Sequence, residues 1–176
     1  SRDLFWKKIM SEANYQPTIS GYTTTLNCID QEYPYEKCIE SMLAFCDEIV
    51  VVDGGSDDGT WEVLTSLADT NEKIKIHQVK RDWNHKRFAV FDGAQKAAAR
   101  EKCTMDYCWQ MDADEVATAG TREKIVNFCR SWPATVDLVC FPVLEFWGSE
   151  DKVRVDVNPW KWRLSKNLSH ITHGVP

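Results

Sequence analysis

The chain contains no long hydrophobic run. Its longest apolar stretches are about four to six residues, whereas a membrane-spanning helix needs about 20, so we expect neither a spanning helix nor a signal peptide. Low-complexity segments, internal repeats and linkers rich in glycine or proline are also missing. With 43% hydrophobic and 27% charged residues in 176, the composition is that of a globular protein. We therefore predict a single domain over residues 1–176, and the missing initial methionine indicates a piece of a longer chain.

Basic charge is scarce. Lys and Arg total 21 against 27 Asp and Glu, which gives a net charge of −6. Nucleic-acid phosphates require a clustered basic surface, so we expect no nucleic-acid partner. Residues 80–102 are the exception, with seven basic and three acidic residues. Here we expect Lys86 and Arg87, which precede a helix, to lie near phosphate groups, and Lys96, Arg100 and Lys102 to lie on a solvated helix face.

Several diagnostic motifs are absent. The seven cysteines form no C-x-x-C pair, so neither a zinc site nor a disulfide framework is indicated, and a reducing, cytoplasmic location fits best. There is no G-x-G-x-x-G after the first predicted strand and no G-x-x-x-x-G-K-[ST], which argues against a Rossmann dehydrogenase and a P-loop NTPase. The acids after residue 53 do not have the spacing of a calcium-binding EF-hand loop.

The sequence alternates between apolar, β-branched runs and segments of helical periodicity. This pattern predicts an α/β fold with a mostly parallel central sheet flanked by helices. The predicted strands are 18–26, 48–53, 73–79 and 107–111, and the predicted helices are 36–45, 60–67, 87–102 and 121–132, the last capped by Thr118 or Thr121. Further on we expect a bent strand at 136–147, a strand at 153–157, and a sheet extension or cover at 158–166.

Acidic residues collect where predicted strands end. Asp53 closes one strand and runs into Gly-Gly-Ser-Asp-Asp-Gly, while Asp112 and Asp114 follow another. Ligands of open α/β sheets bind beyond the carboxyl ends of the strands. Carboxylates there repel one another unless a divalent cation bridges them to an anionic ligand, which favours Mn²⁺ or Mg²⁺ with phosphate. Turn and cap chemistry remains the alternative for Asp53 and the preferred role of Asp57, Asp58 and Gly59, and we expect Glu115 to cap the next helix.

Three stretches of the sequence, SGYTTTLN, DEIVVVDGGSDDGT and WQMDADE, resemble the nucleotide-sugar-binding half of the family-two glycosyltransferases, which have the GT-A fold. The likeness covers Ile19 to Glu115. The later stretch PWKWRLSKNLSHITHG is similar to the branch that builds lipopolysaccharide cores and other surface polysaccharides. The resemblance implies an inverting transfer from a nucleoside-diphosphate sugar, with UDP favoured, and a Mn²⁺ or Mg²⁺ ion held by the D-x-D motif.

The same resemblance assigns roles to single residues. It implies that a strand segment wraps the base and ribose, that Asp53 reads the base, and that Arg87, with Lys86, lies near the base or the phosphates. The strand segment that would wrap the base and ribose consists of Thr23, Thr24 and Thr25. Asp114 would bind the metal directly, and Asp112 would contact the ribose or reach the metal through water. Among late histidines that could join the metal, His173 is the first candidate and His170 the second.

An inverting transfer needs a base that deprotonates the acceptor hydroxyl. The resemblance implies an acid well beyond the D-x-D motif, and the candidates in order are Glu145, Asp156 and Asp151. Two alternatives are that Glu145 is an ordinary strand residue and that the base lies beyond Pro176.

We therefore predict a metal-dependent glycosyltransferase domain that acts on a saccharide or lipid-linked acceptor in the cytoplasm. The amphipathic segment at 4–10 could add peripheral membrane contact. A sugar nucleotidyltransferase is an alternative, although it would carry a glycine-rich basic loop where this chain has TTTLN. A nucleotide-sugar-binding module without activity is the non-enzymatic alternative.

Overall fold

The computed structural model describes residues 15–84 and 87–173. They form a six-stranded sheet in the order β3-β2-β1-β4-β6-β5. The strands are β1 (Ile19–Thr25), β2 (Glu48–Asp53), β3 (Ile74–Gln78), β4 (Tyr107–Gln110), β5 (Leu138–Pro142) and β6 (Trp160–Lys166). Strands β3, β2, β1 and β4 pair in parallel, whereas β6 is antiparallel to both β4 and β5. The predicted fold class is confirmed.

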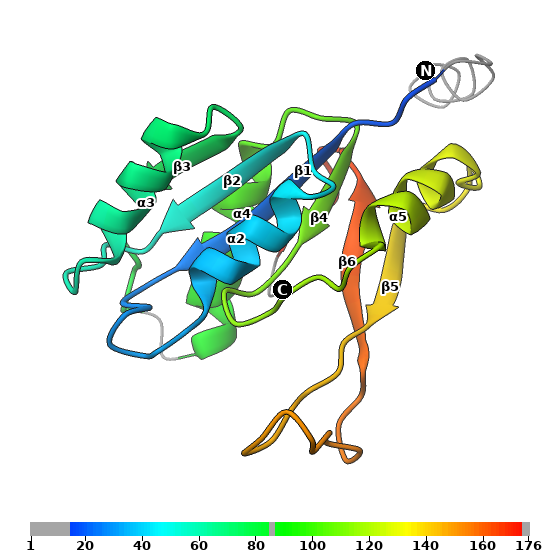
Figure 1. Cartoon of the computed structure of the whole chain (residues 1–176). Coiled ribbons are helices and arrows are strands. Elements are labelled where there is room, and N and C mark those ends of the chain that lie inside the picture. Colours follow the sequence, from blue (N-terminus) through cyan, green and yellow to red (C-terminus); the bar gives the residue numbers. More distant parts are fainter. Residues whose placement is uncertain (1–14, 85–86, 174–176) are drawn as a thin grey trace.

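Helices cover both faces of the sheet (Figure 1). They are α2 (Tyr35–Leu43), α3 (Thr60–Thr70), α4 (Phe88–Glu101) and α5 (Thr121–Arg130). Strand β2 shows the division, because Ile49 and Val51 pack into the core with α2, α3 and α5, while Val50 and Val52 pack with Ala99 of α4. Successive side chains of a strand point to opposite faces, so a continuous apolar strand serves both layers.

Helix α2 packs very closely on β1. A Cβ atom at Gly21 would lie 2.9 Å from the Ile49 Cδ1 and Met42 Sδ atoms and 3.0 Å from the Cys46 Sγ atom. Only glycine allows this approach. The seven cysteines are all free thiols, and six of them are buried, as expected for small apolar side chains in a core.

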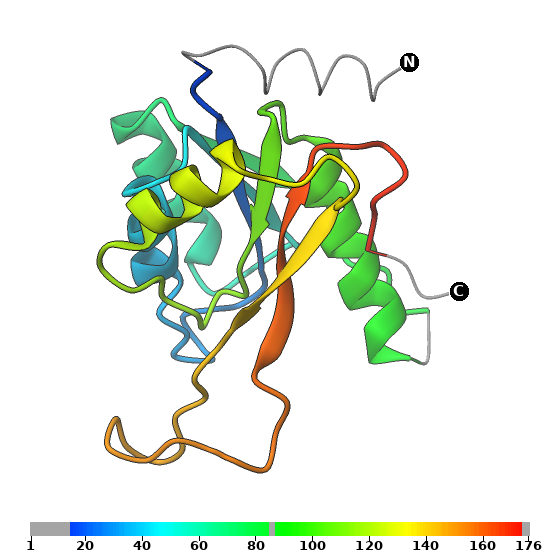
Figure 2. The ribbon, with the colours of Figure 1, turned by 90° about the vertical axis from the view of Figure 1, so that its right-hand side faces the viewer.

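The C-terminal part of the sheet differs from the prediction. Strand β5 ends at Pro142, and the chain then leaves the sheet as an arm, residues 143–159, before it returns as β6 (Figures 1 and 2). The strand predicted at 153–157 is wrong: only Val153 forms a bridge, to Phe146, and Val155 is 94% exposed. An extended segment becomes a strand only where a neighbour pairs with it. Residues 160–166 do extend the sheet.

Two helices, α3 and α5, begin directly after a glycine. Helix α5 begins after Gly120, which has a φ of 77°. Gly120 therefore occupies the N-cap position that was predicted for Thr118 or Thr121. Helix α3 begins after Gly59, whose φ is 99°, and the Asp58 carboxylate accepts the Thr60 N–H at 2.9 Å, as predicted. Within the described residues no helix is long and apolar enough to cross a bilayer. The amphipathic segment at 4–10 lies outside these residues.

Candidate active site

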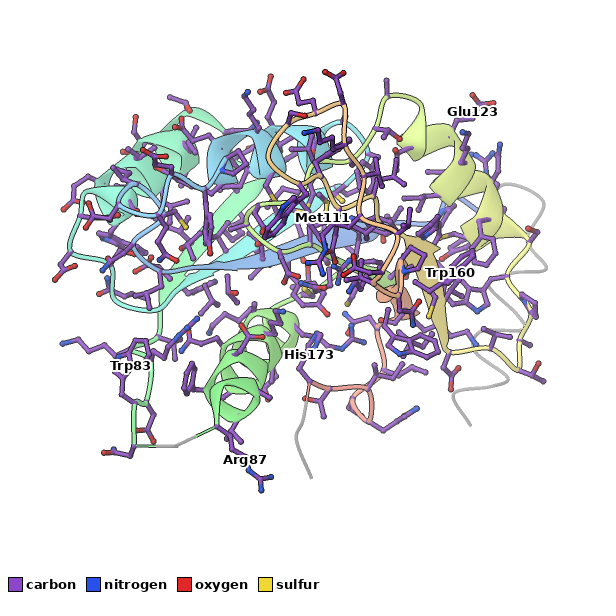
Figure 3. All side chains as sticks on the ribbon, turned by 90° about the horizontal axis from the view of Figure 1, so that it is seen from below. Trp83, Arg87, Met111, Glu123, Trp160 and His173 are labelled. Atoms are coloured by element: carbon purple, nitrogen blue, oxygen red, sulfur yellow. The ribbon has the colours of Figure 1, made fainter. Side chains whose placement is uncertain are left out.

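The sheet has a topological switch point between β1 and β4. The chain runs outward from β1 to β2 and β3, and then crosses to the other side of β1 to form β4. Such a crossover opens a crevice at the carboxyl ends of the two strands. Asp112 and Asp114 follow β4 directly, and Asp53 ends β2 beside Thr25 of β1. Figure 3 views the molecule from below, with Met111 near the centre, His173 beside α4 and Trp160 toward the β5–β6 side.

The D-x-D motif forms a turn, because the Glu115 N–H donates to the Asp112 carbonyl at 3.0 Å. The Lys96 ammonium of α4 lies 2.7 Å from Asp112 Oδ1, which also accepts from the Gln110 amide at 2.9 Å. Arg163 Nη2, from β6, lies 3.4 Å from Asp112 Oδ2. Two cations from different elements therefore hold this carboxylate.

Arg163 ties β6 to this turn. Its guanidinium donates to the Gln110 side-chain oxygen and the Glu115 carboxylate as well as contacting Asp112. The other Glu115 oxygen accepts the Asp112 N–H at 3.0 Å. The prediction that Glu115 caps the next helix is wrong, because α5 begins only at Thr121 and the Glu115 carboxylate is used by Arg163.

Burial and charge give the three acids different acidities. Burial would by itself raise the pKa of Asp112, but the Lys96 and Arg163 charges outweigh it and lower this pKa. Asp114 is exposed, yet partial loss of water around its carboxylate and the Asp112 charge raise its pKa. Burial raises the pKa of Glu115 despite the Arg163 charge. Asp112 is therefore the firmly ionised member of the group.

Asp53 holds the loop after β2 together. This buried carboxylate accepts the N–H groups of Gly55 and Ser56 at 2.9 and 2.8 Å, the Ser56 hydroxyl at 2.6 Å and the Thr25 hydroxyl at 2.9 Å. Asp53 thus has the turn-stabilising role that was the alternative reading of its sequence position. Recognition of the nucleotide base by Asp53 stays a prediction. Thr25 is buried like Thr23, and Thr24 is half-buried.

Arg87 lies at the N-terminus of α4 and is exposed. Figure 3 shows it at the free end of that helix, away from Met111. Lys86 lies outside the described residues. The structure therefore does not bring Arg87 to the two aspartates. The basic residue of α4 that reaches Asp112 is Lys96, and the prediction of a solvated face is wrong for Lys96.

Arg100 also departs from the solvated face that was predicted, and it anchors the end of the described chain. It is 5% exposed, and its guanidinium donates to the carbonyls of Ile171 and Lys166 at 2.8 and 2.9 Å and to the Ser165 hydroxyl at 2.8 Å. Lys102, by contrast, is exposed as predicted. Residue 171 is therefore fixed against α4 and β6, two positions before His173.

His173 contacts β1. Its Nε2 atom lies 2.6 Å from the Tyr22 hydroxyl. Burial, followed by the Lys96 and Arg100 charges, lowers the pKa of His173 to about 4, so its imidazole is neutral at neutral pH. His170 is a surface residue with Nε2 3.6 Å from an Asp137 oxygen.

The predicted metal ligands are not assembled around one point. Among the described residues no three His, Cys, Asp or Glu side chains are grouped as a metal site. Asp112 faces two cations and His173 faces Tyr22, whereas Asp114 forms no ion pair within the described residues. Of the predicted ligands, the D-x-D motif retains the exposed Asp114 carboxylate and, two residues earlier, the ionised Asp112 carboxylate.

The candidate bases lie in the arm. Glu145 lies 3.6 Å from both the Arg154 and the Lys161 nitrogens. Asp156 accepts two hydrogen bonds from Arg154, at 3.1 and 2.9 Å, and these lower its pKa. Asp151 is an exposed turn residue. A single arginine thus links the first two candidates.

Sequence reasoning missed Lys96 and Arg163 as partners of the D-x-D motif. Lys96 lies four residues after Asp92, and its ammonium also reaches that carboxylate at 3.1 Å, which on the sequence looks like a surface i,i+4 pair. Arg163 gave no signal of this contact, because its strand, WKWRLSK, carries two lysines as well. What could not be read was that β6 pairs with β4.

The chain is similar to known glycosyltransferases. The sequence model of Glycosyl transferase family 2 matches residues 24–145. The lipopolysaccharide core biosynthesis glycosyltransferase LpsC of Rhizobium meliloti is 38% identical over 96 residues, which are 54% of this chain and 32% of LpsC. The chain therefore spans about a third of that relative.

Solved structures of two glycosyltransferases share the fold. Staphylococcus aureus TarS 1–349 in complex with UDP aligns with a TM-score of 0.54 and 17% identity, covering 76% of this chain and 36% of TarS. The mannosyltransferase PcManGT of Pyrobaculum calidifontis, in complex with GDP-Man and Mn²⁺, aligns with a TM-score of 0.54 and 19% identity, covering 83% and 42%. The fold is thus of the GT-A type.

Proposed function

The chain belongs to glycosyl transferase family 2, and we propose that it transfers a sugar, with inversion, from a nucleoside-diphosphate sugar to a saccharide or lipid-linked acceptor. The proposed reaction depends on a divalent metal, and the proposed donor is a UDP-sugar. One observation carries the proposal: the two aspartates after β4 lie at the switch point of the sheet, and the first of them, Asp112, contacts cations from α4 and β6. Acidic and basic groups meet there as binding of a metal diphosphate requires.

The residues present fit a metal bound mainly through its substrate. Mg²⁺ is usually held by one or two carboxylates and by phosphate oxygens and water. Asp114 offers an exposed carboxylate for direct binding, and Asp112, two residues earlier, would act through water or on the ribose. When bound, the ion would neutralise charge on the departing diphosphate. A neutral His173 retains the lone pair needed to join this site, which would require it to leave Tyr22.

Lys96 is placed to assist the same diphosphate. Its ammonium is shared between Asp92 and Asp112, at 3.1 and 2.7 Å, so it keeps positive charge beside the D-x-D turn. Burial by itself would lower the pKa of Lys96. The negative charges of Asp112 and Asp92 raise this pKa by more than burial lowers it, so the net change is upward. A permanently charged ammonium favours a bound phosphate.

The acceptor hydroxyl must lose a proton as it attacks. We assign this role to Glu145 in first place and Asp156 in second, as the arm extends from the edge of the sheet where β5 ends and β6 begins. Arg154 favours the ionised form of Asp156 and so makes it the weaker base. The Glu145 carboxylate lies 3.6 Å from each of its two basic neighbours, which is longer than a hydrogen bond.

The test is calorimetric titration of UDP, with GDP for comparison, in Mn²⁺ and then in EDTA. We expect metal-dependent binding that Asp114→Ala abolishes. The matched control is Asp69→Ala, which removes an exposed aspartate on α3 and should leave the affinity unchanged. Equal binding by wild type and Asp114→Ala, or binding unaffected by EDTA, would contradict the metal assignment. If neither nucleotide binds the folded protein with metal present, the proposed UDP or GDP donor site is wrong.

Turnover separates the alternatives. Incubation with a UDP-sugar should release UDP, by transfer or by slow hydrolysis, and NMR of the anomeric proton reports inversion. Binding without UDP release would identify a binding module. Release of pyrophosphate from a nucleoside triphosphate and a sugar 1-phosphate would identify a nucleotidyltransferase. A cytoplasmic location and peripheral membrane contact remain predictions.

A further inference from the structure

A cavity of about 310 Å³ lies beside the D-x-D turn, between α4, strand β6 and residues 171–173. Its volume is at the lower end of the ~300–1,000 Å³ typical of small-molecule sites. The lining includes Asp92 and Lys96 of α4, Trp162 of β6, Tyr22 of β1, and His173. The cavity therefore lies on the α4 face of the sheet.

The walls of this cavity differ in chemistry. Trp162 is 61% exposed and Leu138, also in the lining, is 37% exposed, so one wall presents an aromatic ring and an aliphatic side chain to solvent. The opposite wall carries the Asp92 carboxylate and the Lys96 ammonium, paired at 3.1 Å with side-chain exposures of 23% and 18%. An uncovered tryptophan facing a partly exposed acid and base is the arrangement of a site for a flat, hydroxyl-rich ligand.

Lys96 joins the cavity to the proposed donor site. It lines the cavity, and its ammonium also lies 2.7 Å from Asp112 Oδ1. A ligand held here is therefore separated from the D-x-D turn by a single side chain. This proximity is what a transfer reaction needs between its two substrates.

We propose that this cavity is the acceptor subsite and that it binds one pyranose ring, stacked on Trp162, with its hydroxyls hydrogen-bonded to Asp92 and Lys96. The inference rests on the proposed glycosyl transfer. A pyranose ring has an apolar face of C–H groups, which packs on an indole ring, and a rim of hydroxyls, which both donate and accept. Asp92 supplies the acceptor atoms and Lys96 the donor atoms.

The experiment is saturation-transfer NMR on the whole chain, with Mg²⁺ and UDP present and methyl pyranosides of glucose, galactose and mannose as probes. We expect transfer to the ring protons of at least one probe. Trp162→Ala should weaken this signal roughly five- to tenfold, because it removes the stacking surface, whereas Trp162→Phe should keep most of it. Asp92→Asn should weaken the signal as well and alter which hydroxyls are required.

The matched control is Trp147→Ala, which removes a tryptophan of the arm that is 68% exposed and does not line the cavity. Calorimetry of UDP on each variant separates the two proposals. If UDP binds but no pyranoside gives a signal, or if Trp147→Ala weakens the signal as much as Trp162→Ala, the acceptor subsite is wrong and the donor site stands. If the pyranosides bind and UDP does not, the proposed function fails, and the acceptor role fails with it.

Discussion

Replacement of Arg163 by methionine is the sharpest test of how the D-x-D turn is held. Arg163 has an 8% exposed side chain and bonds Gln110, Glu115 and Asp112 at once. Methionine keeps the unbranched apolar stem and removes the charge together with all three contacts. The Arg163 side chain is thus replaced with little change in shape, so the effect reports the polar network.

The stability that Arg163→Met loses depends on the acidic groups that lose a partner. Asp112 keeps the Lys96 ammonium at 2.7 Å, so its charge remains compensated. Glu115, whose side chain is 17% exposed, loses its cation and keeps only the Asp112 N–H at 3.0 Å. Removing one partner of a buried ion pair costs about 3–5 kcal/mol. This cost is smaller here because Glu115 is partly exposed and can take up a proton. We therefore expect the unfolding free energy to fall by about 2–3 kcal/mol.

Urea unfolding followed by tryptophan fluorescence measures this loss. The double variant Arg163→Met/Glu115→Gln should recover about 1–2 kcal/mol relative to the sum of the single variants, because both members of the pair are then removed. Lys161→Met on the same strand is the control, since its pair with Glu145 is long and exposed. We expect the control to lose about 0.5 kcal/mol or less. A loss of the same small size for Arg163→Met, or strict additivity in the double variant, would refute the reasoning.

Three further predictions concern other parts of the molecule. Gly21→Ala should lower the unfolding free energy by about 1–2 kcal/mol in the same urea assay, since its Cβ would meet Met42 Sδ at 2.9 Å; unchanged stability would contradict this packing. Hydrogen bonds to Asp58, led by the one from Thr60, outweigh its desolvation and lower its pKa, so Asp58→Ala should cost about 0.5–1 kcal/mol near pH 7. Because this folded-state pKa is depressed, that cost should be present above the unfolded pKa of Asp58 and vanish as pH falls through the lower folded value; a cost independent of pH between 7 and 3 would count against it. Glu145→Gln should reduce transfer at least about 100-fold with little change in UDP affinity, and retained turnover would move the base to Asp156 or elsewhere.

The parallel half of the fold could be read from the sequence because its signals are local. Glu48–Asp53 is a short run of β-branched residues, and both of its faces are buried between helix layers, so the run itself specifies the strand. Glycine at 59 and Asp58 mark the start of α3 in the same local way. Hydrophobic periodicity and turn residues act over a few positions, which is why these elements needed no knowledge of their neighbours.

The C-terminal strands could not be placed in the same way. The predicted strand at 153–157 has the alternation of a strand, yet within residues 15–84 and 87–173 it pairs only at Val153, with Phe146. Residues 160–166, with exposed Trp160 and Trp162, read equally well as a cover, and became a strand because β4 offered a free edge. Pairing between distant segments is a property of the assembled sheet.

The sequence by itself determined the fold class, the positions of Asp53, Asp112 and Asp114 at strand ends, and the family resemblance. Only the tertiary structure decided which charges meet. Lys96 is 16 residues before Asp112 and Arg163 is 51 residues after it, yet both reach its carboxylate. Sequence patterns report which residues lie near one another along the chain, whereas the partner of a charge depends on which helix and which strand pack together in space.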